Sequence, residues 1–209
     1  MVSNINQAKQ YSEFLSRWLI ANPEWENWLL HRIAQPIDRE VLKGIFQENL
    51  DALPTSQLAE ENFCSALRIA RQKTMMYLGV RDLTDQASLY EVMQGMSDMA
   101  EIALAYASDY AKQQMQNDYG LPYYPDGSEM NIWIIGMGKL GACELNVSSD
   151  IDLIFIYDVD GQTTGGEKSL SHHEWFSRLG KRIIKYLSEI TAQGFVFRVD
   201  MRLRPNGDS

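Results

Sequence analysis

Apolar residues recur every three or four positions through most of the first 117 residues, and this spacing predicts helices. A short amphipathic helix is expected to begin at Ser12, and another lies between the two prolines that follow it. Asp38 is placed to cap a helix that runs to about Asp51 and is stopped by Pro54. The first half of the chain is therefore expected to be helical throughout.

Two longer segments show the same spacing. The first follows Thr55 and Ser56, and its predicted buried face has one polar member, Thr74. That face consists of Phe63, Leu67, Ala70, Thr74, Tyr77 and Leu78. The second covers residues 89–115 and contains a methionine stripe, Met93, Met96 and Met99, which we expect to fill core space rather than form a flexible binding surface. A basic series, Arg68, Arg71, Lys73 and Arg81, is expected on the solvated side of the first segment, with an anion site as the alternative.

The pattern changes after residues 118–128, which are rich in proline, glycine and aspartate and predict a turn-rich boundary. Residues 131–135, 151–157 and 195–203 are rich in β-branched and aromatic side chains and predict three strands. Residues 172–193 predict a helix that Gly194 ends. The expected fold class is α+β, with a helical region over 1–117 and a sheet-containing core over 118–209, packed together as one unit. So few strands predict a core that is incomplete at its C-terminus, as in a fragment.

Composition narrows the classes of function. The 209 residues carry a net charge of −9, which argues against general nucleic-acid binding. Cys64 and Cys143 lack the spacing of a zinc site and predict two reduced thiols. The N-terminus does not resemble a signal peptide, and no apolar run approaches the ~20 residues that span a bilayer. We therefore expect a cytoplasmic protein with no nucleic-acid partner and no membrane partner.

A glycine-rich turn, Gly136 to Gly141, follows the first predicted strand and can bring backbone N–H groups close to phosphate. Its spacing also satisfies the dinucleotide-binding fingerprint, with Asp158 near the expected acidic position. However, residues 142–149 are too few for the crossover helix that a parallel β–α–β unit requires. A Walker A loop fails because Leu140 stands where serine or threonine is needed.

The remaining interpretation is a nucleotidyltransferase site of the polymerase-beta-like kind, with a mixed sheet and flanking helices. Asp150 and Asp152 are two residues apart and project from one face of the second strand. On the third strand one face carries only charged residues, namely Arg198, Asp200, Arg202 and Arg204. Three clustered carboxylates can hold Mg²⁺, whose preferred ligands are hard oxygens. The alternatives are capping or turn chemistry for the first two acids and cross-strand ion pairs on a solvated face for the third.

Four separated blocks closely resemble the bifunctional glutamine synthetase adenylyltransferase/adenylyl-removing enzyme family. They are 136–141, 144–146, 149–154 and 199–205, and the helical segments around 68–71 and 79–83 resemble that family too. The resemblance implies that the chain is the opening part of the adenylyl-removing domain. In that family this domain removes AMP from a tyrosine of glutamine synthetase by phosphorolysis, yielding ADP, and a second domain adds AMP from ATP.

The resemblance also implies roles for individual residues. Asp150, Asp152 and Asp200 would be catalytic and bind Mg²⁺, and Gly136, Gly138, Lys139 and Ser149 would hold nucleotide and phosphate. Arg202 and Arg204 would orient phosphate or pair with the acids. The implied partners are glutamine synthetase, AMP, ADP or ATP, phosphate and a PII signalling protein. The alternatives are a different nucleotidyltransferase, moving AMP or UMP from a triphosphate, and an inactive fragment that binds glutamine synthetase or PII.

Overall fold

The computed structural model describes residues 2–53 and 59–201, and contacts divide the chain into two compact units. The first unit extends to Ile102 and also includes Cys143–Ser148, and the second contains Ala103–Ala142 and everything after Ser148. The division therefore falls inside a helix rather than at the expected boundary between residues 117 and 118. The tight packing of Tyr110 against Tyr186, whose ring centroids lie 5.6 Å apart, ties the second half of that helix to the sheet-containing unit.

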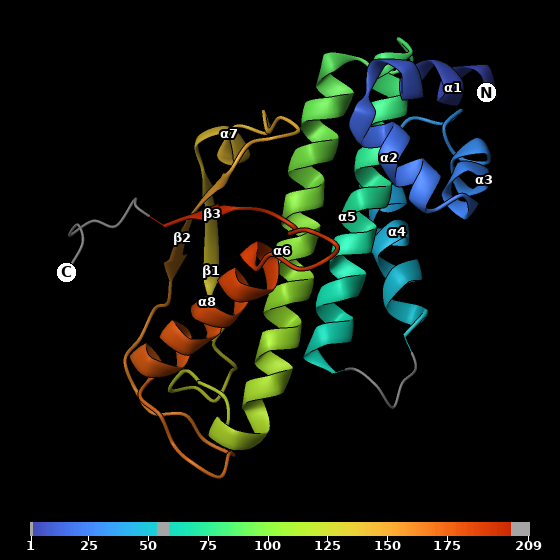
Figure 1. Cartoon of the computed structure of the whole chain (residues 1–209). Coiled ribbons are helices and arrows are strands. Elements are labelled where there is room, and N and C mark those ends of the chain that lie inside the picture. The colour runs from blue at the N-terminus through green and yellow to red at the C-terminus, as the bar shows by residue number, and fades with distance from the viewer. Residues whose placement is uncertain (1, 54–58, 202–209) are drawn as a thin grey trace. The chain divides into compact units, whose positions relative to one another are not determined.

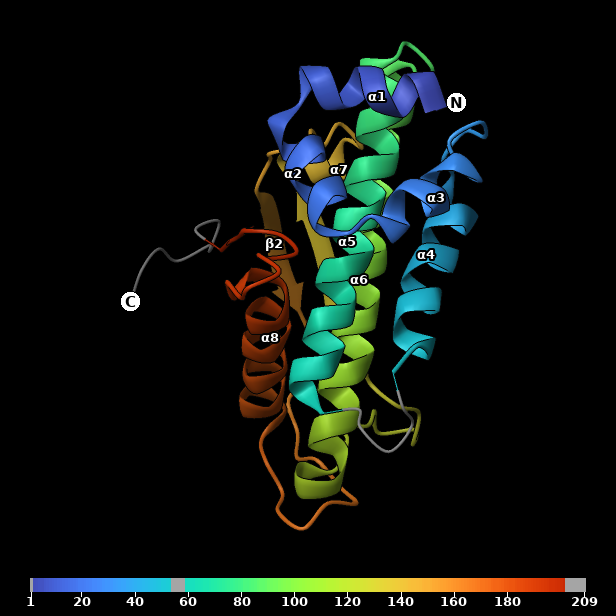
Figure 2. The same ribbon diagram turned by 45° about the vertical axis from the view of Figure 1, so that its right-hand side comes forward.

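Helices build the first unit, as the periodicity predicts (Figures 1 and 2). They are α1 (Val2–Tyr11), α2 (Glu13–Ala21), α3 (Glu24–Leu30), α4 (Arg39–Asp51), α5 (Glu60–Leu83) and the first part of α6 (Leu89–Tyr119). Ser12 caps α2 by accepting a hydrogen bond from the backbone N–H of Leu15, and Asp38 caps α4 in the same way from Val41. Pro54, Thr55 and Ser56 lie outside the described residues.

Helix α5 is the centre of the first unit, and α4 packs along it (Figure 2). The whole predicted face is buried, including Thr74, and Met96 and Met99 of α6 are fully buried while Met93 is partly so. The methionine stripe is therefore core, as expected. The expectation of a solvated basic side is wrong for two of its members, because Arg68 is 0% and Arg81 is 4% exposed. Helix α5 is enclosed on several sides. The spacing of its apolar residues therefore predicts only part of the surface that is buried.

The buried guanidinium of Arg81 donates four hydrogen bonds to partners from three segments of the first unit. It donates to both carboxylate oxygens of Glu91, at 2.7 and 3.0 Å, and to the backbone carbonyl oxygens of Ile33 and Gln86. Glu91 also accepts a hydrogen bond from the backbone N–H of Ile37. Burial alone would raise the pKa of Glu91, but its hydrogen bonds with Arg81 and Ile37 outweigh that effect and lower it. This network joins α5, α6 and the chain between α3 and α4.

The second unit contains a three-stranded mixed sheet with the strand order β1-β2-β3 (Figure 1). Strand β1 (Trp133–Met137) pairs antiparallel with β2 (Ile151–Ile156), and β2 pairs parallel with β3 (Val199–Asp200). The four-residue α7 (Gly138–Gly141) follows β1, and the long α8 (His172–Ser188) precedes β3. The expected α+β fold class is thus confirmed. Strand β1 begins and ends two residues later than predicted, because its ladder continues into the glycine turn.

Helix α8 covers one face of the sheet. Gly180 allows a close approach, since a Cβ at this position would lie 2.9 Å from the ring of Phe155 in β2. Trp175 is 1% exposed, and its indole N–H donates to the carbonyl oxygen of Gly120 at 3.1 Å. Ile151 and Leu153 of β2 are also buried. The opposite face of the sheet is the one that bears the acidic side chains.

Two predicted boundaries near the end of the described chain are wrong. Helix α8 ends at Ser188 rather than Gln193, because Glu189 is extended and Gly194 instead closes a turn with Thr191. The third strand is restricted to Val199–Asp200 within the described residues, where a strand from residue 195 was expected. The backbone N–H groups of Val196 and Phe197 both bond to the carbonyl oxygen of Leu187, so these residues cap α8 instead of joining the sheet.

The two cysteines are free thiols, as expected. None of the helices over the described ranges is both long enough and apolar enough to cross a lipid bilayer.

Replacing Glu91 with glutamine tests the network of Arg81. We expect Glu91→Gln to lower the free energy of unfolding by about 3 kcal/mol, because it leaves a buried guanidinium without its charged partner. Since folding lowers the pKa of Glu91, its contribution is complete above the ordinary pKa of about 4.3 and is lost as pH falls through the folded value. Urea unfolding between neutral pH and pH 3 measures both effects.

The control is Glu101→Gln, which removes the more exposed partner of Arg39 and should cost less than about 1 kcal/mol. Equal losses in the two variants, or the same acid dependence in Glu91→Gln as in the parent protein, would contradict this account of the network.

Candidate functional site: a glycine turn beside an acidic sheet face

Three glycines fix the path of the chain between β1 and β2. Gly138 has a φ of +54°, a region that L-residues with side chains enter only with strain. A side chain at Gly141 would place its Cβ 2.5 Å from the carbonyl oxygen of Gly136. A side chain at Gly136 would press on Leu140, at 2.9 Å from its Cγ. A Cβ therefore has no room at Gly141, and Gly138 adopts a φ that disfavours any side chain.

The pairing register places Asp152 and Asp200 side by side on the face of the sheet opposite α8. In the antiparallel ladder Met137 is the partner of Asp152, and in the parallel ladder Asp200 is its partner. Residues that pair directly across a ladder project to the same face. The register between β2 and β3 thus puts these two acids on one face, and both are partly exposed.

Gly138 and Asp152 come close together at this face. If Gly138 carried a side chain, its Cβ would lie 2.9 Å from Oδ2 of Asp152. The missing side chain therefore lets the backbone of the turn come close to the carboxylate. Backbone N–H groups this close to an acid could contact a phosphate that shares a hard cation with the acid.

Asp150 is engaged differently. Its Oδ1 accepts from Nε of Arg198 at 2.5 Å, and the backbone N–H of Ile151 bonds to the carbonyl oxygen of Arg198 at 2.9 Å. Across residues 2–53 and 59–201 the structure brings together no group of three carboxylate, histidine or cysteine side chains that could hold a metal ion. Cross-strand ion pairing was the alternative interpretation of the charged face of the third strand. The pair between Arg198 and Asp150 is of this kind.

The remaining predicted residues lie around the turn or beyond the described part. Lys139 is exposed at the start of α7, and its Nζ lies 3.4 Å from the hydroxyl of Ser149. Lys139 of the turn and Ser149, two residues before β2, thus lie next to each other. Arg202 and Arg204 lie outside the described residues.

The topology excludes the dinucleotide-binding interpretation of the turn. That interpretation requires two parallel strands joined by a crossover helix, whereas β1 and β2 are antiparallel and only α7 and a short loop connect them. Asp158, the acid that would contact a ribose, instead accepts a hydrogen bond from the hydroxyl of Tyr124 at 2.6 Å, which raises the pKa of that tyrosine.

An apolar stripe on the acidic face was not predicted. Trp133, Ile135 and Met137 alternate along β1 and are 61%, 41% and 37% exposed, and Ile156 of β2 lies opposite Trp133 with 42% exposed. The alternation of large apolar residues in 133–137 is the signal that could have found it. The sequence does not reveal which of the two faces of β1 a helix covers. In the structure the exposed face, with Trp133, Ile135 and Met137, is the more apolar of the two.

The candidate site consists of two carboxylates, Asp152 and Asp200, beside a glycine turn that carries the exposed Lys139. Carboxylates offer hard oxygen ligands, and backbone N–H groups of a glycine turn can contact phosphate oxygens. Asp152 and Asp200 are the residues that could share a divalent cation, whereas Asp150 is paired with Arg198.

Comparison with known proteins extends this picture. A family model described as glutamate-ammonia ligase adenylyltransferase matches residues 2–209. The chain is 44% identical over 200 residues to a Burkholderia mallei protein named bifunctional glutamine synthetase adenylyltransferase/adenylyl-removing enzyme. The aligned residues make up 95% of this chain and 22% of that protein. Proteins of the same name from Ralstonia nicotianae and Shewanella oneidensis are 42% and 40% identical over 95% of this chain. The chain spans about a fifth of the length of these curated relatives.

Gly138→Ala tests the contact between the turn and Asp152. We expect about 1–2 kcal/mol of lost stability, because the new side chain must adopt a positive φ. We also expect Mg²⁺ affinity to fall at least about tenfold, because the added Cβ would displace the carboxylate of a metal ligand. Calorimetric titration with Mg²⁺ measures the second effect and urea unfolding the first.

The matched control is Gly127→Ala, which has a φ of +85° but no atom within 4 Å of the new Cβ. It should lose similar stability and keep its Mg²⁺ affinity. The same Mg²⁺ affinity in both variants would show that Gly138 does not shape a metal site.

Arg198→Ala tests how the ion pair affects the acids. Both partners are about half exposed, so stability should change by less than about 1 kcal/mol. Mg²⁺ binding should become about two- to fivefold tighter, because a cation that competes for Asp150 has been removed. Arg178→Ala breaks a comparably exposed pair with Glu174 and should leave Mg²⁺ binding unchanged. Weaker Mg²⁺ binding in Arg198→Ala would instead identify Arg198 as a residue that positions Asp150.

Proposed function

The chain belongs to the glutamate-ammonia ligase adenylyltransferase family, and on that premise we propose that its acidic sheet face removes AMP from adenylylated glutamine synthetase by phosphorolysis. The substrates would be inorganic phosphate and an adenylyl-tyrosine of glutamine synthetase, and the products ADP and tyrosine. Several relatives carry both an adenylyltransferase and an adenylyl-removing activity in their names. The removing reaction is our assignment for this part of the family.

One observation carries the proposal. Gly138 turns at a positive φ directly beside the carboxylate of Asp152, and Asp152 is paired in register with Asp200. A phosphoryl transfer needs few covalent contributions from the protein and depends on positioning and on neutralising charge. Two carboxylates paired in register beside a glycine turn that also carries Lys139 support that type of reaction.

In the proposed reaction an oxygen of inorganic phosphate attacks the phosphorus of the AMP group. A new oxygen–phosphorus bond forms, and the bond between that phosphorus and the tyrosine oxygen breaks. The tyrosine oxygen leaves with the bonding electron pair and takes up a proton, since its parent phenol has a pKa of about 10. The backbone of the glycine turn and the ammonium of Lys139 would hold the phosphate oxygens in line for this displacement.

Mg²⁺ would be held by Asp152 and Asp200, with Asp150 as the third ligand, and when bound it supplies positive charge that stabilises the attacking and leaving oxygens. The chain's own residues orient the reactants. Ser149 lies next to Lys139, where its hydroxyl could donate to a phosphate oxygen. Arg202 and Arg204 are assigned to orienting phosphate, on the family resemblance alone.

The decisive assay gives adenylylated glutamine synthetase, Mg²⁺ and phosphate to the full polypeptide in which this sequence occurs, and follows the release of ADP. Asp152→Asn should reduce the rate by at least about 100-fold, because it removes an anionic oxygen ligand that would hold Mg²⁺ at the reacting phosphate. Asp158→Asn should leave the rate unchanged, since this acid is bound by Tyr124 at the far end of β2.

Unchanged activity in Asp152→Asn, or no ADP release by the parent protein, would contradict the proposal. Incorporation of labelled AMP or UMP from a triphosphate through the same residue would identify a different nucleotidyltransferase. Binding of glutamine synthetase or a PII protein without any turnover would identify an inactive binding module.

A further inference from the structure

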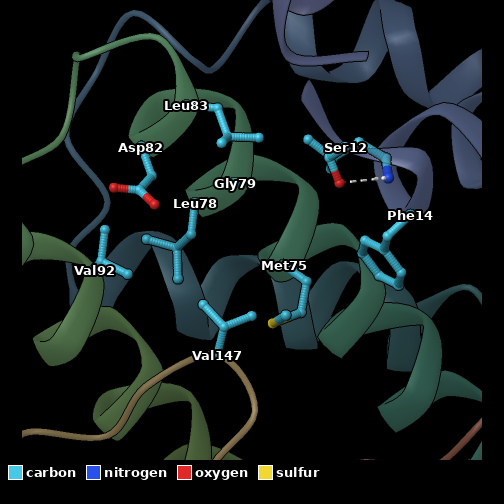
Figure 3. Close-up of a pocket in the computed structure, with 10 residues that line it drawn as sticks. Ser12, Phe14, Met75, Leu78, Gly79, Asp82, Leu83, Val92 and Val147 are labelled. Carbon is cyan, nitrogen blue, oxygen red and sulfur yellow. Dashed lines mark hydrogen bonds between the residues drawn. The ribbon is translucent and has the colours of Figure 1, made fainter. Parts of the chain in front are cut away.

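The first unit contains a pocket that the proposed reaction does not use. It is a cavity of about 180 Å³ whose walls come from α2, α5, α6 and the segment Cys143–Ser148 (Figure 3). Its floor is rigid core, because Leu15, Leu78 and Val92 are each less than 7% exposed. Gly79 lies in the wall formed by α5 and contributes no side chain to fill the space.

The rim of the pocket is apolar and open. Phe14 and Val147 are 36% and 45% exposed there, although both are large apolar side chains. Met75, Leu78 and Val147 converge on the same space (Figure 3). An occupant that covered Phe14 and Val147 would remove their apolar surface from water, which is the main source of affinity in such a site.

The negative charge of Asp82 at the rim indicates which kind of ligand the pocket favours. Among the described residues that line the pocket, Asp82 is the one that is charged, and its carboxylate lies at the rim near Leu78 and Val92 (Figure 3). Asp82 is exposed, and the described part of the chain offers its carboxylate no ion-pair partner. The neighbouring Arg81 is committed to Glu91 and to backbone carbonyl oxygens. The pocket therefore attracts a cation and repels an anion such as a nucleotide.

We propose that this pocket binds a small amphiphilic cation, in which one apolar group of about the size of a benzene ring carries a protonated amine. The volume supports the size, since an apolar cavity of about 150 Å³ is enough to hold benzene. The apolar group lies on Leu15, Met75 and Leu78, and the ammonium faces Asp82. The occupant also contacts Val147, three residues ahead of Asp150 in the chain, within a segment that Leu145 anchors by its buried side chain and by its N–H bond to Ser97.

The test uses three probes of one shape: 2-phenylethylammonium, neutral 2-phenylethanol and anionic phenylacetate. Binding is followed at low ionic strength by the NMR shifts of the methyl groups of Met75, Leu78, Val92 and Val147. The ammonium should bind about three- to fivefold more tightly than the alcohol, as expected for a partly exposed charge, and phenylacetate should bind most weakly.

Two variants separate charge from shape. Asp82→Asn should abolish the preference for the ammonium over the alcohol. The matched control Asp85→Asn should keep it, because Asp85 lies outside the pocket and its φ of +55° suits asparagine. Val147→Trp, at the exposed rim, should weaken all three probes about tenfold or more by filling the opening.

Three results would overturn the proposal. They are the absence of shifts at these methyl groups with the ammonium probe, binding of phenylacetate as tight as that of the ammonium, and an unchanged preference in Asp82→Asn. Methyl signals of Leu42 and Ile45, in the core beneath α4, report whether each variant is folded.

Discussion

The structure of the candidate site depends on the absence of side chains at one turn. Gly141 lies so close to the carbonyl oxygen of Gly136 that no Cβ fits between them, and Gly138 adopts a φ that side chains disfavour. These two constraints close the link between β1 and β2 into a short antiparallel connection. They thereby place the backbone of the turn directly beside the carboxylate of Asp152. A longer or looser link would separate the turn from that carboxylate.

A second constraint operates in the helical unit, where charge is buried and paired. The bidentate contact of Arg81 with Glu91 joins α5 to α6, and the same guanidinium holds the chain near Ile33. Leu145 belongs to this unit although it lies between the glycine turn and β2 in sequence. The segment that leads into the acid-bearing strand is therefore anchored on helices, and its Val147 also lines the apolar pocket of Figure 3.

Local signals in the sequence predicted local structure well. Ser12 and Asp38 were expected to cap helices because their side chains can accept from nearby backbone N–H groups, and both do. The length of the link correctly excluded a crossover helix. The period of two residues predicted that Asp150 and Asp152 share a face, whereas the position of Asp200 beside Asp152 follows from the register between β2 and β3.

Features that depend on distant contacts were not predictable in this way. The burial of Arg68 and Arg81 follows from the central position of α5, which helical periodicity does not reveal. The helix expected to reach Gly194 ends at Ser188, because the chain turns back and bonds to its last carbonyl oxygens. Arg198 was expected on the charged face, but its pairing with Asp150 depends on the register between β2 and β3.

We propose that Asp152, Asp200 and the glycine turn form one metal and phosphate site. Paramagnetic broadening of backbone amide NMR signals by substoichiometric Mn²⁺, an ion that shares the oxygen ligands of Mg²⁺, tests this in the presence of inorganic phosphate. We expect the broadening to be strongest at Gly138, Asp152 and Asp200 and to be reversed by excess Mg²⁺. Broadening centred on other carboxylates, or none at these three residues, would contradict it.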